Sequence, residues 1–194
     1  MLQTITSLDL QMLLWIQQNL QSPTLTSFLE CMTDLGNAGI VWIAIAAILW
    51  VNSRTRWVGI AVFLAIALDV VVTNGILKPL IARPRPFLLD LSITPLITPP
   101  TGFSFPSGHS VSSFAAAFVL YRLLPKGYGI PAITLAVLIS LSRIYLGVHY
   151  PSDILAGLLL GFAIAKVVLW LMQKTEFLYW FFTKTFQVVP RRKE

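Results

Sequence analysis

A chain of 194 residues with 56% hydrophobic and only 11% charged residues is too apolar for a soluble domain, in which about a quarter of the residues are charged. These proportions predict an integral membrane protein with a single domain over 1–194. The net charge of +6 does not indicate a nucleic-acid partner, since a basic excess in a membrane protein more often sets its orientation. The one cysteine, Cys31, excludes an internal disulfide.

Two short amphipathic helices are expected first, at 8–20 and 24–34. The first carries a helical stripe of leucines and ends before Pro23, and the second ends at Gly36. Helices of this kind suit the membrane interface or the rim of a bundle, so residues 1–36 are interpreted as an interfacial segment.

Five membrane-spanning helices are predicted next, at 38–52, 57–77, 107–124, 129–147 and 153–173. Three of them have apolar cores of only about 14 residues, fewer than the ~20 that a helix needs to cross a bilayer. In the third and fourth, polar motif residues supply the missing length at one membrane face, whereas the first stays marginal. The fold class expected is an all-α polytopic membrane helix bundle at 37–173.

Two further segments are distinctive. The long loop at 79–106 is rich in Pro, Thr and Ser, and loops of this length between helices are usually functional or disordered. Because it joins two polar motifs, we interpret it as a functional cover. After the last span, residues 177–182 (FLYWFF) have the composition of an interfacial aromatic belt, within an interfacial and cytoplasmic tail at 174–194.

The cations divide unequally between the two ends of the predicted spans. One end has nine: Arg54, Arg56, Arg122, Lys126, Lys174, Lys184, Arg191, Arg192 and Lys193. The other end has four: Lys78, Arg83, Arg85 and Arg143. The positive-inside rule places the first end and the C-terminus in the cytoplasm, so the second end, with the polar motifs, is expected to face outward.

The only two histidines of the chain lie in short polar motifs. His149 and Asp153 are four residues apart, which puts two helical side chains on one face with Cβ atoms about 5–6 Å apart. Pro151 is tolerated in a first helical turn, so a helix is expected to open at Tyr150 or Pro151. A carboxylate beside an imidazole fixes its tautomer and leaves the other nitrogen free as a nucleophile or base. The alternative is an N-capping Asp153 beside an interfacial histidine.

The segment FSFPSGHS, at 103–110, precedes an apolar helix. Ser107 suits the N-cap, Gly108 lets the backbone approach a ligand, and free N–H groups at a helix start bind phosphate oxygens. His109 stands beside that position, where it could donate a proton. The alternative is a capped helix with an uninvolved histidine.

Three cations border the apolar spans: Lys78, Arg85 and Arg143. Arginine offers a planar fork for phosphate oxygens, and lysine a point charge. Simple snorkelling to the interface is the alternative, and it fits Lys78 better than Arg143. Arg83 could replace Arg85 as the phosphate ligand. Together the motifs contain the groups needed for phosphoryl transfer without a metal.

Asp69 lies inside the second span, where an ionisable residue is a functional candidate by default. Structural pairing with a nearby hydroxyl, an amide or Lys166 is favoured over a direct role. Asn74 could line the site.

The three motifs resemble the signature of the type 2 phosphatidic acid phosphatase superfamily: Lys78-x6-Arg85-Pro86, Pro106-Ser107-Gly108-His109 and Ser142-Arg143-x5-His149-x3-Asp153. The match is complete at every signature position and spans residues 78–153. The flanking helices are similar to the small bacterial membrane members of the superfamily, the undecaprenyl-pyrophosphate and phosphatidylglycerophosphate phosphatases.

The resemblance implies a phosphatase for a lipid phosphate or pyrophosphate, without metal or cofactor, in the cytoplasmic membrane of a bacterium. It implies that His149 attacks phosphorus to form a phosphohistidine, that Asp153 orients His149, and that His109 protonates the leaving oxygen and later activates water. The groups implied to hold the phosphate oxygens are Lys78, Arg85, Ser107, Gly108 and Arg143. The expected partners are the lipid phosphate substrate and membrane lipids, with no nucleic acid; the oligomeric state is left open.

Two other functions compete with this interpretation. A transporter or channel would spread polar residues through several spans, whereas here they gather at one end. A zinc site formed by His109, His149 and Asp153 has an acceptable ligand set, but three nearby cations would repel the ion.

Overall fold

The computed structural model describes residues 2–174, and within these residues every regular element is a helix. The expected all-α membrane bundle is therefore confirmed. The predicted aromatic belt at 177–182 and nearly all of the predicted tail lie outside the described residues.

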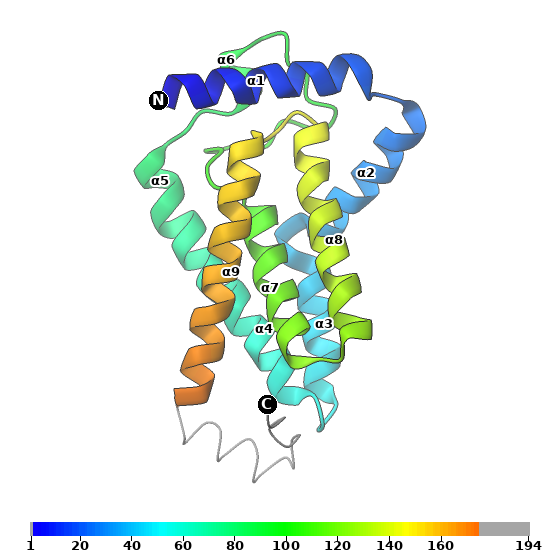
Figure 1. The fold of residues 1–194 in the computed structure, drawn as a ribbon, viewed down its shortest axis with the longest axis vertical. Coiled ribbons are helices and arrows are strands. Elements are labelled where there is room, and N and C mark those ends of the chain that lie inside the picture. The colour runs from blue at the N-terminus through cyan, green and yellow to red at the C-terminus, as the bar shows by residue number, and fades with distance from the viewer. Residues whose placement is uncertain (1, 175–194) are drawn as a thin grey trace.

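The first helix, α1 (Leu2–Asn19), lies across one end of the bundle (Figure 1). The second, α2 (Pro23–Gly36), starts at an N-cap serine, Ser22, whose hydroxyl accepts the Leu25 N–H. The hydroxyl of Tyr145 bonds to Thr26 at 2.8 Å and fastens α2 to the last turn of α8 (Lys126–Tyr145).

The interpretation of α2 as a separate interfacial helix was incomplete. A short turn, η1 (Asn37–Gly39), joins it to α3 (Ile40–Val51), and the turn is left-handed at Ala38 (φ 50°) and Gly39 (φ 69°). Left-handed residues end one helix and let the chain turn into the next, so α3 follows α2 directly across a kink. The combined stretch from Pro23 to Val51 has 29 residues, which removes the length shortfall of the predicted first span.

The next run begins with α4 (Arg56–Asp69) and continues through a π-helical segment, η2 (Val70–Leu77), into α5 (Lys78–Ile81). The buried Thr73 hydroxyl donates to Asp69 at 2.6 Å, so the predicted pairing of Asp69 with a hydroxyl is confirmed. Lys166 is not that partner, since its ammonium lies over the Phe162 ring.

The loop expected at 79–106 is shorter than predicted. The end of α5 and a further single-turn helix, α6 (Pro86–Leu89), lie inside it. Proline at the first position of α6 favours this turn, because its fixed φ suits a helix start.

The last three helices are α7 (Gly108–Leu123), α8 and α9 (Pro151–Lys174), and each matches a predicted span within a few residues. Small residues let α7 and α9 approach closely. A Cβ on Gly157 would lie 2.6 Å from Ser110 Cβ, and one on Gly161 would lie 2.8 Å from the Val111 carbonyl oxygen.

Four helical stretches of the described chain are long and apolar enough to cross a membrane: Pro23–Val51, Arg56–Leu89, Lys126–Tyr145 and Pro151–Gln173. The remaining predicted span is α7, which at 16 residues is shorter. It runs through the middle of the bundle, packed by α4, α8 and α9, and most of its residues are buried (Figure 1). Because protein surrounds it, its polar start does not face lipid.

All the motif-bearing segments reach the end of the bundle covered by α1. These segments are α5, the start of α7, the end of α8 and the start of α9, whereas the α3–α4 and α7–α8 connections lie at the opposite end (Figure 1).

Candidate active site

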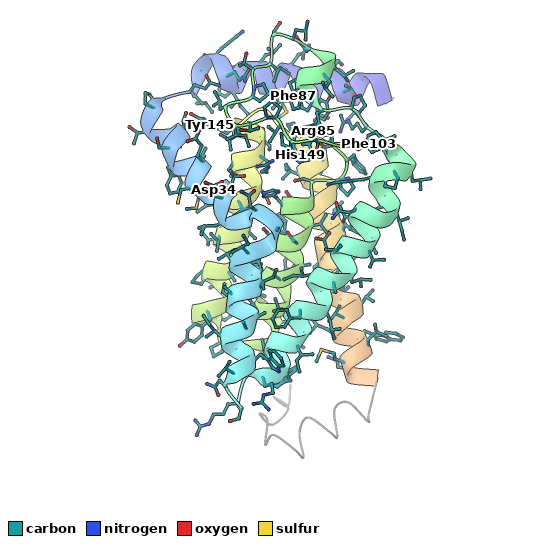
Figure 2. The ribbon with its side chains drawn as sticks, turned by 180° about the vertical axis from the view of Figure 1, so that it is seen from behind. Asp34, Arg85, Phe87, Phe103, Tyr145 and His149 are labelled. Carbon is teal, nitrogen blue, oxygen red and sulfur yellow. The ribbon has the colours of Figure 1, made fainter. Side chains whose placement is uncertain are left out.

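The predicted site residues meet beneath α1, where Figure 2 shows Arg85 beside His149 at the end of the bundle. The connection from α8 to α9 turns back on itself at this point. The backbone N–H groups of Val148 and His149 both donate to the Arg143 carbonyl oxygen at 3.2 Å. These bonds keep Arg143 and His149, two residues of the same motif, close together.

His149 lies just before α9 and Asp153 lies in its first turn, as the sequence predicted. The imidazole Nδ1 is 3.2 Å from Asp153 Oδ2, and the side chain is almost fully buried. A carboxylate can only accept here, so the network assigns the neutral ring's proton to Nδ1. The lone pair of Nε2 then faces Arg85 Nη1, which is 3.4 Å away.

Burial lowers the pKa of His149 to about 4, while the hydrogen bond and charge of Asp153 oppose that shift. The charges of Arg85 and Arg143 lower the pKa of His149 further, but burial is the larger cause. At neutral pH the ring is therefore uncharged, which leaves a nitrogen lone pair available for attack on phosphorus.

The Asp153 carboxylate accepts four hydrogen bonds. Its Oδ2 accepts from His149, from the Ser104 hydroxyl and, at 3.0 Å, from the Tyr150 N–H. Its Oδ1 accepts from Arg83 Nη1 at 2.7 Å. The carboxylate is fully buried, so these donors replace water and stabilise its charge.

The two neighbouring arginines have different partners. Arg85 donates to two backbone carbonyls of the long loop at 79–106, called the cover loop below: Gly102 at 3.0 Å and Thr101 at 3.3 Å. It also donates to the Val148 carbonyl at 2.9 Å. Arg83 instead pairs with carboxylates. Of the two arginines, it is thus Arg85 that lies beside His149 Nε2.

The start of α7 combines a hydroxyl, a glycine and an ammonium group. Ser107 occupies the N-cap position, and its buried hydroxyl oxygen has no hydrogen-bond partner within the described residues. A Cβ on Gly108 would lie 3.7 Å from Lys78 Nζ, so the ammonium sits against the helix start. An unpaired buried donor and a cation at a helix N-terminus are groups that favour an anion such as a phosphate oxygen.

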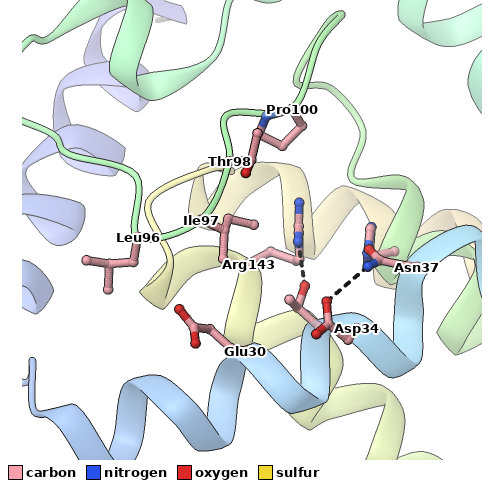
Figure 3. Close-up of a pocket in the computed structure, with 10 residues that line it drawn as sticks. Glu30, Asp34, Asn37, Leu96, Ile97, Thr98, Pro100 and Arg143 are labelled. Carbon is pink, nitrogen blue, oxygen red and sulfur yellow. Dashed lines mark hydrogen bonds between the residues drawn. The ribbon is translucent and has the colours of Figure 1, made fainter.

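Arg143 lies at the end of α8, where it donates through Nη1 to the Thr33 hydroxyl of α2 (Figure 3). Its Nε is buried without a hydrogen-bond partner among the described residues. Arg143 and His109 line one cavity of about 540 Å³ between α2 and the cover loop, whose other lining residues include Glu30, Asp34 and Thr98.

His109 is held by α2 and the turn after it. Its Nε2 is 3.0 Å from Asn37 Oδ1. Asn37 Nδ2 donates to Asp34 at 3.1 Å, which sets the orientation of the amide (Figure 3). A Cβ on Gly36 would lie 2.8 Å from the His109 ring, so glycine is required beneath it. The imidazole can therefore face the cavity with one ring nitrogen fixed.

Several residues of this site were missed by the sequence analysis: Asp9, Thr33, Asn37, Ser104 and Ser152. One signal was available, because Asp9 is the only charged residue of α1. The metal hypothesis finds no ligand set, since residues 2–174 contain no group of three His, Cys, Asp or Glu side chains close enough to hold an ion.

Comparison with known proteins agrees with the motifs. Residues 57–177 match the family model of the PAP2 superfamily. The chain is 37% identical to an undecaprenyl-diphosphatase of Sulfolobus acidocaldarius, over 73% of this chain and 68% of the relative. It is 31% identical to a lipid A 4'-phosphatase of Bacteroides thetaiotaomicron, over 83% and 75% of the two chains.

Two solved structures share the fold. One is the crystal structure of a PAP2-type phosphatidylglycerolphosphate phosphatase from Bacillus subtilis, with a TM-score of 0.70, 29% identity and coverage of 90% of this chain and 88% of that one. The other is Aquifex aeolicus LpxE, with a TM-score of 0.72, 29% identity and coverage of 82% and 93%. The chain therefore belongs to the PAP2 superfamily, among its membrane lipid phosphatases.

Proposed function

We propose that the protein removes the terminal phosphate of a lipid phosphate or pyrophosphate through a phosphohistidine on His149, at the outer face of the membrane. The observation that carries the proposal is the buried His149–Asp153 pair, with its free Nε2 directed toward Arg85. Phosphoryl transfer needs mainly positioning and charge stabilisation, and three cations next to a helix N-terminus supply both.

In the first step, Nε2 of His149 forms a bond to phosphorus as the bond from phosphorus to the leaving oxygen breaks. Protonated His109 gives its proton to that oxygen. Asp153 stabilises the positive charge that His149 gains. In the second step, neutral His109 takes a proton from water, and the resulting hydroxide displaces Nε2 to release inorganic phosphate.

The remaining groups hold the three equatorial oxygens of the phosphoryl group. In this proposal the phosphate ligands are Lys78, Arg85, Ser107, the Gly108 N–H and Arg143. Their charges offset the charge that builds up on those oxygens in the transition state.

Phosphate release from a panel of lipids tests this function. We expect the protein to hydrolyse, in detergent, at least one of undecaprenyl pyrophosphate, phosphatidylglycerophosphate, phosphatidic acid and a lipid A phosphate. Roughly millimolar EDTA should leave the rate unchanged. The same preparation with His149→Gln is the control for contaminating phosphatases. Complete loss of activity in EDTA, with recovery on adding Zn²⁺, would favour a metal mechanism instead.

The outward orientation rests on charge. At the end of the bundle opposite the site, the α3–α4 and α7–α8 connections carry or adjoin Arg54, Arg56, Arg122 and Lys126. The four cations at the site end, Lys78, Arg83, Arg85 and Arg143, lie in or near the proposed catalytic centre, so their place is explained by the chemistry of the site. Positive residues in short connecting loops favour the cytoplasmic side, so the site is assigned to the other side.

Cysteine labelling tests that orientation. In a Cys31→Ser background, Leu91→Cys places a thiol in the cover loop, where the native leucine is 90% exposed. An impermeant maleimide added to intact cells should label Leu91→Cys. The matched variant Asn52→Cys, in the opposite connection, should react only after lysis. The reverse pattern would place the site in the cytoplasm.

A further inference from the structure

Asp9 is a buried carboxylate on a helix that was expected to lie at the membrane interface or the rim of the bundle. It is 5% exposed and faces the bundle from the middle of α1. Its Oδ1 accepts the Ser152 N–H at 3.1 Å, and its Oδ2 accepts from the Ser152 hydroxyl and, at 2.8 Å, from Arg83 Nη2. Ser152 is the residue immediately before Asp153, so Asp9 bonds directly to the first turn of α9.

Arg83 links Asp9 to the catalytic centre. Its guanidinium bonds to Asp9 through Nη2 and to Asp153 Oδ1 through Nη1, the latter at 2.7 Å. The Arg83 guanidinium lies over the Tyr150 ring, with Cζ 3.7 Å from the ring centroid, and this contact helps to hold the guanidinium in place. One arginine is thereby shared between two carboxylates.

We propose that Asp9 is a positioning residue of the phosphatase, acting through Arg83 and Ser152 to keep Asp153 aligned with His149. By this inference α1 completes the active site rather than serving only as an interfacial helix. The inference rests on the proposed roles of His149 and Asp153.

The physical reason lies in how arginine meets a carboxylate. An isolated guanidinium prefers to bond both oxygens of one carboxylate at once. In this site Asp153 must keep Oδ2 for His149, the Ser104 hydroxyl and the Tyr150 N–H. The second arm of the Arg83 fork, Nη2, bonds to Asp9 and more weakly to the Thr6 hydroxyl, so Arg83 holds Asp153 by Oδ1 alone. Without Asp9, the free arm can turn toward Oδ2 and compete with His149.

The first test is kinetic. Asp9→Asn keeps the size of the side chain and removes its charge, and we expect kcat to fall by about 10- to 100-fold with little change in KM, the usual scale for a group that orients a catalytic residue. The matched control is Gln17→Ala, which removes a polar anchor of α1 outside this network, a 2.6 Å bond from Nε2 to the Thr94 carbonyl. The control should retain kcat.

The second test separates positioning from general stability. If Arg83 competes for Asp153 once Asp9 is gone, removing Arg83 as well should relieve part of the defect. We expect kcat of the Asp9→Asn, Arg83→Met double variant to exceed the product of the two single effects by at least about 5-fold. Because Asp9 and Arg83 are in direct contact, a purely structural role would give the same coupling in the thermal unfolding temperatures of the four proteins as in kcat, whereas a positioning role gives it in kcat alone.

Equal losses of kcat in Asp9→Asn and Gln17→Ala, or additive losses in the double variant, would overturn the inference. His149→Gln is assayed beside them. If His149→Gln still turns over, the proposed mechanism fails as well. If it is inactive while Asp9→Asn matches wild type, only the role of Asp9 is wrong.

Discussion

His149→Gln is expected to lower kcat by about 10⁴-fold or more, because it removes the nitrogen that forms the covalent intermediate. Glutamine is similar in size and can still bond to Asp153, so the buried pocket should remain filled and the protein folded. Phosphate release from the preferred lipid in detergent measures the effect. Size-exclusion profiles and thermal unfolding of the two proteins check that only chemistry has been lost.

The location of the covalent bond can be tested sharply, because the chain has only two histidines. With ³²P-labelled substrate and rapid acid-free quenching, label should be trapped on wild-type protein and be absent from His149→Gln. His109→Gln is the matched variant: with an aryl phosphate, whose leaving group needs no proton, it should still acquire label. Label on His149→Gln would exclude His149 as the nucleophile.

Asp153→Asn is expected to lower kcat by about 10³- to 10⁴-fold, the scale seen when an imidazole loses the carboxylate that sets its tautomer. The amide of asparagine cannot accept a hydrogen bond from both Arg83 and His149. If its NH2 faces Arg83, two donors meet; if it faces His149, the ring must carry its proton on Nε2, where attack is impossible.

Steady-state kinetics with the preferred lipid check this second expectation. Ser104→Ala is the matched variant, since it removes one donor to the same oxygen and leaves the carboxylate in place. It should cost far less than Asp153→Asn. Similar losses in the two variants would mean that Asp153 acts through its structural bonds and not through the charge beside His149.

Much of the bundle follows from composition and local spacing. The helices α8 and α9 begin and end within a few residues of the predicted spans, because a bilayer requires long apolar runs and because prolines and charged residues mark where those runs stop. The relation of His149 to Asp153 was predictable for a similar reason: four residues at a helix start fix which side chains meet.

The bend between α2 and α3 and the π-helical segment before Lys78 were not predictable in this way. Each depends on contacts made elsewhere. The chain leaves α2 at Gly36, where the His109 ring from α7 leaves no room for a Cβ. Asp69, the last residue of α4, and Thr73, inside the π-helical segment, bond to each other and are both buried in the bundle.

The amino-acid sequence by itself determined the membrane class, the helical fold and the chemical groups of the site, because apolar length and motif spacing are local properties. Only the tertiary structure decided how those groups are shared. Arg83 and Arg85 are two residues apart with the same chemistry, yet one meets Asp9, which is 74 residues away, and the other meets His149, 64 residues away. A charge takes its role from the partner that folding places beside it, and spacing along the chain does not specify that partner.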